Sequence, residues 1–376
     1  MLQIAFPHRN ADLDAFGEFR ERVRSFLQSD PAAREPRADC WSQFDAAFSR
    51  RLAAAGFLGL TWPKTYGGGE RSSLERFILL EELLAAGAPV GAHWISERQV
   101  GPLLLRYGTE AQRREFLPRI GRAELFFCIG LSEPDSGSDL ASLRTAAVAT
   151  PEGWRVRGRK VWTSNAHRNH YMVLLCRTDP QSQRHAGLSQ LIVDMASPGL
   201  TLRPIPNMSG EHEFNEVTFD DVLVPHDRVV GTVGNGWEQV TSELAFERSG
   251  PERFMSSFIL LRHLAKTAHA LPAEKLGLLT ARLLGLRALS VSVAAMLNDG
   301  KLPNLEAALV KELGSRLEQD VGEILLDGIE SAPDPGSADA MNRLIAQTLL
   351  HAPSYSIRGG AREILRGIIA RGLGLR

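Results

Sequence analysis

The chain has 376 residues and a formal net charge of -1, so it is long enough for two or three domains with an ample hydrophobic core. Without a basic excess, a nucleic acid is not an expected partner. The three cysteines, Cys40, Cys128 and Cys176, show neither Cys-x-x-Cys nor Cys/His spacing, so the sequence predicts no metal site and no disulfide framework. A reduced, cytoplasmic setting fits these features.

The first residues predict no targeting segment. Residues 1–27 mix arginine, aspartate and glutamate with apolar residues at helical spacing, and they contain no uninterrupted apolar stretch, which argues against a signal peptide. No run in the chain approaches the roughly 18 apolar residues that cross a membrane, so no membrane span is expected.

The N-terminal part of the chain has a helical pattern. Between about residues 12 and 120, apolar residues recur at spacings of three and four, as at Phe16, Phe19 and Val23 and again from Phe77 to Leu84. We therefore expect an N-terminal α-helical domain over residues 1–123.

The helical period is lost between about residues 125 and 224. Segments 154–157, 170–175, 188–193 and 216–219 are alternating or continuously apolar, and turns rich in Gly, Pro and Asp separate them. This pattern is typical of β-strands. It predicts a central antiparallel β domain over residues 124–230, built as a barrel or as a pair of packed sheets.

From Gly236 to its end the chain becomes helical again. Segments 275–297 and 305–326 carry broad apolar stripes, and turn-forming residues at 298–300 and 331–337 separate the expected helices. We expect a C-terminal α-helical bundle over residues 231–376. The predicted fold class is thus α+β and multidomain, with helical, β and helical parts in that order.

Two short segments are the most specific feature of the sequence. Residues 131–139 read Leu-Ser-Glu-Pro-Asp-Ser-Gly-Ser-Asp, and residues 160–165 read Lys-Val-Trp-Thr-Ser-Asn. The first joins a short strand to a tight turn, and the second adds an aromatic side chain and two hydroxyls. This chemistry suits a flat ring with polar edges, such as a flavin, although the first segment alone is also ordinary β-turn chemistry.

Both segments resemble motifs of the acyl-CoA dehydrogenase family, whose fold also runs helical, β, helical. The resemblance covers nearly the whole chain and implies an FAD cofactor seated on the β domain. It implies that Leu131 and Ser132 offer backbone and hydroxyl groups to the pyrimidine edge of the flavin. It also implies that Ser138 reaches the pyrophosphate, and that Trp162 and Ser164 flank the ring.

The same resemblance implies a few further cofactor contacts. Ile129 lies two residues before the first motif, Gly137 lies within it, and Glu363 matches a family glutamate that lies close to the flavin. Ala361 replaces the usual threonine of that C-terminal motif, so the hydroxyl contact of the family is missing there.

Dehydrogenation of an acyl thioester requires a base for the α proton, a hydride acceptor and a group that polarises the carbonyl. The family places the base in a C-terminal motif or on the first helix after the β domain. In this chain Gly359 stands at the C-terminal position, and the helix carries Glu247 followed by Arg248. This arrangement resembles isovaleryl-CoA and long-chain acyl-CoA dehydrogenases, and it implies Glu247 as the base, Arg248 beside the pocket and the Gly359 N–H on the thioester carbonyl.

The residues around Glu247 are unusual without reference to any family. Glu243 lies four residues before it, so two carboxylates share one helix face, and like charges at this spacing are unfavourable. Pro251 cannot donate to the carbonyl of Glu247 and Gly250 loosens the same turn, so the helix should kink or end just after Glu247. The alternatives are a solvated Glu247 with Arg248 in a surface ion pair, or a base at Glu243 or Glu252.

Two further family motifs are missing from the sequence. An Arg-x-x-Phe-Gly motif is expected near residues 262–275, and a Gln-x-x-Gly-Gly-x-Gly motif is expected near 319–332. In the family both contact the FAD of a neighbouring subunit. Either other cations such as Lys266 or Arg287 replace them, or a different dehydrogenase-like subunit supplies them, or the chain binds FAD weakly.

These observations give three hypotheses for the function. The first is an acyl-CoA dehydrogenase, a dimer or tetramer, that passes electrons to an electron-transferring flavoprotein. The second is a non-catalytic or half-site partner subunit in a hetero-oligomer. The third is an acyl-CoA oxidase-like flavoenzyme, which the short C-terminal part makes less favourable.

Overall fold

The computed structural model describes residues 4–7, 12–33, 37–38, 40–266, 272–326 and 332–375, without the side chains of residues 243–247 and 266. The chain forms two compact units. Unit 1 comprises residues 1–43, 71–90 and 244–376, and unit 2 comprises residues 44–70 and 91–243. The three-part division at residues 123 and 230 stays a prediction about domain boundaries.

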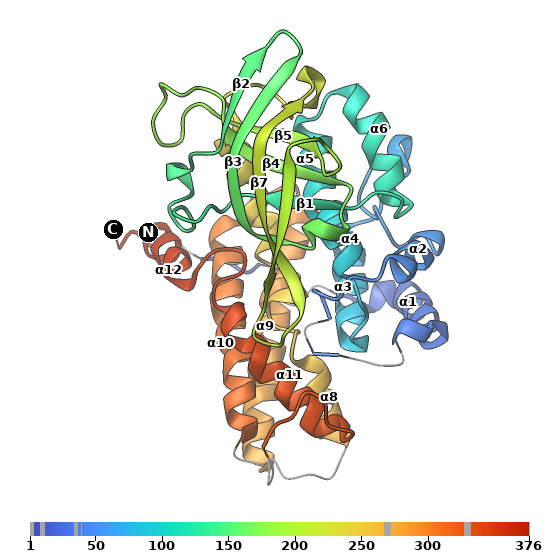
Figure 1. Cartoon of the computed structure of the whole chain (residues 1–376). Coiled ribbons are helices and arrows are strands. Elements are labelled where there is room, and N and C mark those ends of the chain that lie inside the picture. Colours follow the sequence, from blue (N-terminus) through green and yellow to red (C-terminus); the bar gives the residue numbers. More distant parts are fainter. Residues whose placement is uncertain are drawn as a thin grey trace. The chain divides into compact units, whose positions relative to one another are not determined.

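The predicted order of helical, β and helical segments is confirmed (Figure 1). The helices are α1 (Gly17–Ser29), α2 (Ala46–Ala54), α3 (Ser73–Ala86), α4 (Gly91–Ile95), α5 (Gly101–Tyr107), α6 (Glu110–Gly121), α7 (Gly236–Glu247), α8 (Phe258–Lys266), α9 (Ala273–Asn298), α10 (Asn304–Leu326), α11 (Ala340–Tyr355) and α12 (Arg362–Gly372). The strands are β1 (Phe127–Gly130), β2 (Ala146–Thr150), β3 (Gly153–Ser164), β4 (Tyr171–Arg177), β5 (Leu188–Asp194), β6 (Leu200–Pro206) and β7 (His212–Val224).

Unit 1 has its hydrophobic core between α3 and the C-terminal helices. Leu279, Leu286 and Val293 of α9 are buried and recur every seven residues, so they line one face of that helix. They share a core with α10, whose Val310 and Leu317 show the same spacing. The seven-residue spacing in the sequence thus explains why these two long helices pack along each other.

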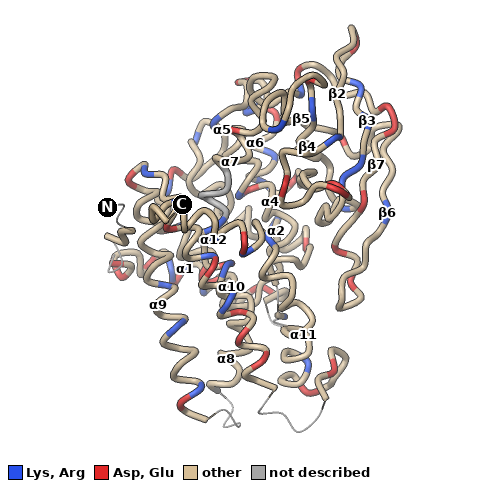
Figure 2. The backbone as a smooth tube through the Cα atoms, turned by 90° about the vertical axis from the view of Figure 1, so that its left-hand side faces the viewer, with Lys and Arg blue, Asp and Glu red and all other residues tan. Residues whose placement is uncertain are grey.

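α9 corrects the expectation about apolar runs. Among the described residues, it is the one helix long and apolar enough to cross a membrane by length and composition, with 44% of its most apolar window buried. Charged residues are sparse along it (Figure 2). This is weak evidence for a membrane span, because the core helix of a globular unit passes the same test, and α9 contributes to the core of unit 1.

Unit 2 contains one seven-stranded sheet with the order β1-β4-β2-β3-β7-β6, and β5 pairs with β4 (Figure 1). The predicted antiparallel pairing holds for β2–β3, β3–β7, β6–β7 and β4–β5. It does not hold for β1–β4 and β2–β4, which are parallel. The reason is that the hairpin of β2 and β3 intervenes in the chain before β4 returns beside β1.

A buried histidine gives unit 2 a pH-sensitive stability. His93 is 4% exposed, and its Nδ1 lies 2.8 Å from the hydroxyl of Ser49. Burial lowers the pKa of His93 to about 3. The folded state disfavours the charged imidazole, so the free energy of unfolding keeps its full value above pH 6.5, the ordinary pKa of histidine. As the pH drops below 6.5, protonation of His93 favours the unfolded state and the free energy of unfolding falls.

Between pH 7.5 and pH 5, His93 is therefore expected to remove about 2 kcal/mol from the free energy of unfolding. Urea titrations of the wild type and of His93→Gln at both pH values measure this contribution. Gln cannot titrate but can still bond to Ser49, so the variant should lose about 2 kcal/mol less over this range. An equal loss in both proteins would contradict the assignment.

Candidate functional site

The two motifs singled out in the sequence lie beside each other in unit 2. The N–H of Val161 donates to the carbonyl of Ser132 at 2.9 Å, which joins the segment after β1 to β3. Two backbone hydrogen bonds of 2.8 and 3.1 Å between Glu133 and Ser136 close the turn that follows. The predicted strand and turn are thus present, and β3 brings Trp162 and Ser164 to the same region.

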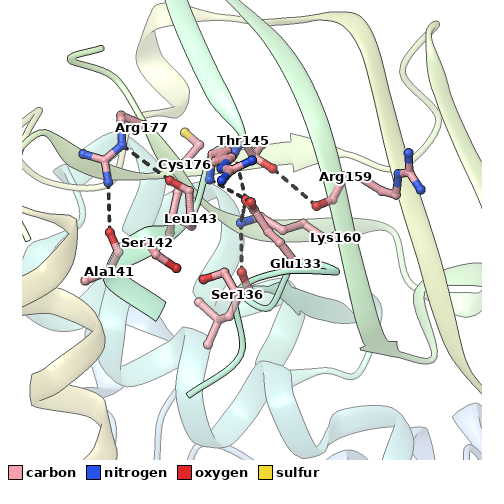
Figure 3. Close-up of polar contacts among 12 residues, drawn as sticks. Glu133, Ser136, Ala141, Ser142, Leu143, Thr145, Arg159, Lys160, Cys176 and Arg177 are labelled. Atoms are coloured by element: carbon pink, nitrogen blue, oxygen red, sulfur yellow. Dashed lines mark hydrogen bonds and ion pairs between the residues drawn. The ribbon is translucent and has the colours of Figure 1, made fainter. Parts of the chain in front are cut away.

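A buried ion pair holds this turn in place (Figure 3). The ammonium of Lys160 is fully buried and donates to the carbonyl of Leu131 and to Glu133, each at 2.8 Å. The carboxylate of Glu133 also accepts the N–H groups of Arg144 and Thr145 at 2.7 and 2.9 Å. Lys160 therefore anchors the motif at two points, while Glu133 links it to the chain that enters β2.

The protonation of this pair follows from its surroundings. Burial alone would raise the pKa of Glu133, but the charge and hydrogen bond of Lys160, together with the hydrogen bonds from Thr145 and Arg144, outweigh burial and hold this pKa below its ordinary value. Burial lowers the pKa of Lys160, and the charge of Glu133 opposes this effect. The pair thus consists of a carboxylate and an ammonium that satisfy each other inside the domain.

Sequence reasoning did not assign a role to Lys160 or Glu133. The signal was the alternation along β3, where Trp154, Val156 and Lys160 fall on the same, buried face. A lysine at an inward position requires a buried acid, and Glu133 in the neighbouring motif is that acid.

Trp162 presents a large apolar surface at a distortion of β3. It lies in a register shift between Lys160 and Thr163, has a φ of 59°, and is 60% exposed. Its ring contacts Phe214 edge-on at a centroid distance of 6.0 Å. A bulky residue in the left-handed region costs about 1–3 kcal/mol, and such strain clusters at functional sites, so the bulge aims an indole outward where a flat ligand can stack on it.

Three residues predicted to contact the cofactor have hydroxyls that make no hydrogen bond among the described residues. Those of Ser132, Ser138 and Ser164 make no hydrogen bond to any described residue, whereas the hydroxyl of Ser136 in the same loop donates to the carbonyl of Asp139 at 2.9 Å. A ring face beside several available hydroxyls fits the flat, polar-edged ring of a flavin. The Trp162 ring and these serine hydroxyls therefore fit a flavin cofactor chemically.

The remaining two predicted cofactor positions in and just before the first motif are less informative. Ile129 lies in β1 opposite Val173 of β4 and is partly buried. Gly137 is exposed, and a Cβ built on it would meet no atom within 4 Å, so the fold itself does not require glycine there. A ligand that approaches the backbone closely would be a reason for it.

In unit 1, α7 ends at Glu247, which confirms the predicted end of the helix. The chain continues through a 3-10 turn at Pro251–Arg253, with Pro251 in its first turn. Proline removes the N–H that would continue the helix, which explains the ending. The side chains of Glu243 and Glu247 lie outside the described residues.

Arg248 and Gly359 are brought together in unit 1. Arg248 is 7% exposed, and its Nε donates to the carbonyl of Gly359 at 3.3 Å. The φ of Gly359 is 65°, and its N–H makes no hydrogen bond to a described residue. This N–H can therefore donate to a ligand carbonyl, as the resemblance implies.

Two other cations fix the same glycine turn, and sequence reasoning missed both. Arg358 donates through Nη2 to the carbonyl of Glu252, to Ser256 and to Glu318, at 3.1, 2.8 and 2.6 Å. Lys311 is fully buried and donates to the carbonyl of Gly360 at 3.0 Å. These contacts pair residues far apart in the chain, so no local sequence pattern indicates them.

The other predicted residues of unit 1 are not part of this turn's hydrogen bonds. Glu363 is exposed in the first turn of α12, and no ion pair to it is present among the described residues. Arg287, considered as a replacement cation for FAD, pairs with Glu81 inside the unit. The side chain of Lys266, the other candidate cation, lies outside the described residues. The same holds for part of each segment in which the two missing motifs were expected.

Comparisons with known proteins agree with the order of these segments. Three family models match the chain one after another. They are the acyl-CoA dehydrogenase N-terminal domain at residues 15–124, the middle domain at 128–222 and the C-terminal domain at 259–374. The chain is similar to the acyl-CoA dehydrogenase IpdE1 of Mycobacterium tuberculosis, with 39% identity over 344 residues, covering 88% of this chain and 87% of that protein.

Two solved structures of high similarity have titles that name two components. The structure titled Tcur3481-Tcur3483 steroid ACAD has a TM-score of 0.87 and 29% identity, covering 97% of this chain and 98% of that chain. The ChsE4-ChsE5 complex from Mycobacterium tuberculosis has a TM-score of 0.84 and 30% identity, with coverage of 97% and 98%.

Proposed function

Because this chain belongs to the acyl-CoA dehydrogenase family, we propose that it catalyses the FAD-dependent α,β-dehydrogenation of an acyl-CoA thioester to the 2-enoyl-CoA. The observation that carries the proposal is the turn at Gly359. Gly359 stands where the family resemblance would place a carboxylate, and its N–H makes no hydrogen bond to the described residues, while a glutamate stands at the end of α7.

In the proposed reaction each residue has a separate task. Glu247 accepts the α proton of the thioester, and the N–H of Gly359 donates to the thioester oxygen as negative charge develops on it. Arg248 holds the carbonyl of Gly359 and so orients that N–H. FAD, when bound, supplies the hydride acceptor, and Ser132, Ser138, Trp162 and Ser164 are the residues that would hold it.

We further propose that a second, dehydrogenase-like subunit completes the cofactor site. The sequence lacks the two motifs that contact a neighbouring subunit's FAD, and Arg287 is committed to Glu81. One of the two similar structures is named as a complex of two components, and the name of the other joins two components with the words steroid ACAD. A bulky, ring-containing acyl group and an electron-transferring flavoprotein as acceptor are parts of this proposal, as is a cytoplasmic location.

Two expression experiments test the dehydrogenase function and the need for a second subunit. The chain is expressed alone, and it is co-expressed with a dehydrogenase gene that lies next to its own gene. We expect a yellow complex only on co-expression, and anaerobic bleaching of its flavin by at least one member of a panel of linear, branched and steroid acyl-CoAs. A yellow, active single-chain product would remove the need for a partner. A yellow complex that no acyl-CoA bleaches would contradict the dehydrogenase function, and fast peroxide formation in air would favour an oxidase.

A further inference from the structure

Unit 1 contains a cavity that the proposed reaction does not use. It has a volume of about 600 Å³ and lies among α1, α3, α8 and α9. Its apolar wall includes Leu27, Phe258 and Leu283, and Phe254 and Met255 are also buried in it. Leu284 lines the cavity and is 59% exposed, so the cavity opens to the surface beside α9.

The charges that line the cavity are unequal. Four arginines and two glutamates line it, which leaves an excess of two positive charges. Both glutamates are already engaged: Glu82 pairs with Arg20 and Arg24, and Glu81 pairs with Arg20 and Arg287. Glu81 and Glu82 are buried, so these ion pairs are part of the wall and leave no acid for a further cation.

Arg262 is the cation without an acid. It is partly buried on α8, and among the described residues it makes no hydrogen bond and no ion pair. Burial lowers the pKa of Arg262, and no acid among the described residues opposes this effect. A guanidinium in such a position is costly unless an anion satisfies it, and its planar fork matches a carboxylate with two parallel hydrogen bonds.

The shape and chemistry together define the class of ligand. A cavity of several hundred Å³ with apolar walls and a single unsatisfied charge is typical of sites for small amphipathic molecules. A neutral apolar ligand would leave Arg262 unpaired, and a multiply charged one would bury charges against leucine and phenylalanine. The fitting ligand has an extended apolar body and one anionic end.

We propose that this cavity is a binding site for a fatty-acid-like carboxylate, whose apolar body lies along α8 and α9 and whose carboxylate pairs with Arg262. None of the residues that line this cavity is among those proposed to hold FAD or to act on the thioester. The proposal therefore stands whether or not the dehydrogenase assignment is correct.

The test uses the purified full chain and a fluorescent fatty acid, 11-(dansylamino)undecanoate, with its methyl ester as the uncharged match. We expect saturable binding of the acid, and weaker binding of the ester by at least tenfold. Arg262→Met should bring the affinity for the acid down to that for the ester and leave ester binding unchanged. Arg371→Met, on exposed α12, removes an equal charge outside the cavity and should change neither.

One further variant locates the probe, and the Tm of Arg262→Met guards against misfolding. Ala86→Trp fills the cavity wall and should weaken binding of acid and ester alike. Arg262→Met removes a charge that has no acid partner, so its Tm should not fall below that of the wild type. The proposal is overturned if the wild type shows no saturable binding, if Arg262→Met still prefers the acid, or if Arg371→Met loses the preference equally.

Discussion

Replacing Glu247 by glutamine is expected to lower kcat for acyl-CoA dehydrogenation by about 10²- to 10⁴-fold, the range that a positioned general base contributes. Glutamine has nearly the same shape but cannot accept the α proton, so thioester and FAD should still bind and KM should change little. Anaerobic stopped-flow spectroscopy of the yellow holoenzyme measures the step directly, as loss of flavin absorbance on mixing with substrate.

Glu243→Gln is the matched control for this experiment. It removes the same charge from the same helix, four residues earlier, and it should retain near-normal flavin reduction. Both variants also relieve the repulsion between two carboxylates at helical spacing, so an effect of charge alone would appear in both. Normal bleaching by Glu247→Gln would sink the assignment, and loss of bleaching in Glu243→Gln alone would move the base to that residue.

Much of the fold could be predicted because it depends on local patterns. The segments predicted as helices at 275–297 and 305–326 are α9 and α10, each extended by no more than two residues at either end. The end of α7 at Glu247 followed from Pro251, since the loss of an N–H acts within one turn. Such features need only the residues within a few positions along the chain.

The contacts missed from the sequence join distant segments. Lys160 and Glu133 are 27 residues apart, and Arg358 and Glu252 are 106 apart, so their pairing depends on which strands and helices become neighbours. The parallel pairing of β1 with β4 was missed for the same reason, because it depends on how the chain crosses over rather than on hydrophobic alternation. The hydroxyls of the motif could be named from the sequence, but the buried charges that support them could not.

Replacing Lys160 by methionine is expected to destabilise unit 2 by about 3–5 kcal/mol, because it leaves the carboxylate of Glu133 buried without its ammonium. Methionine keeps the apolar stem, so the loss reports on the charge and on the two hydrogen bonds to Leu131 and Glu133. Since these bonds hold the loop that carries Ser132, the yellow complex that contains this variant should also lose FAD during gel filtration, even at temperatures where the variant stays folded.

Two comparisons separate this effect from a general change of charge. Arg159→Met removes the neighbouring cation, which is exposed and pairs with Glu216 at 3.6 Å, and such exposed pairs contribute about 0–1 kcal/mol. The double variant Lys160→Met/Glu133→Gln removes both charges, so neither ion is left alone. Its loss of stability should therefore be smaller than the sum of the losses in Lys160→Met and Glu133→Gln. Denaturant unfolding and FAD retention of the wild type, of the single variants Lys160→Met, Glu133→Gln and Arg159→Met, and of the double variant measure these differences. If Lys160→Met unfolds and retains FAD like Arg159→Met, the buried pair does not support the cofactor loop.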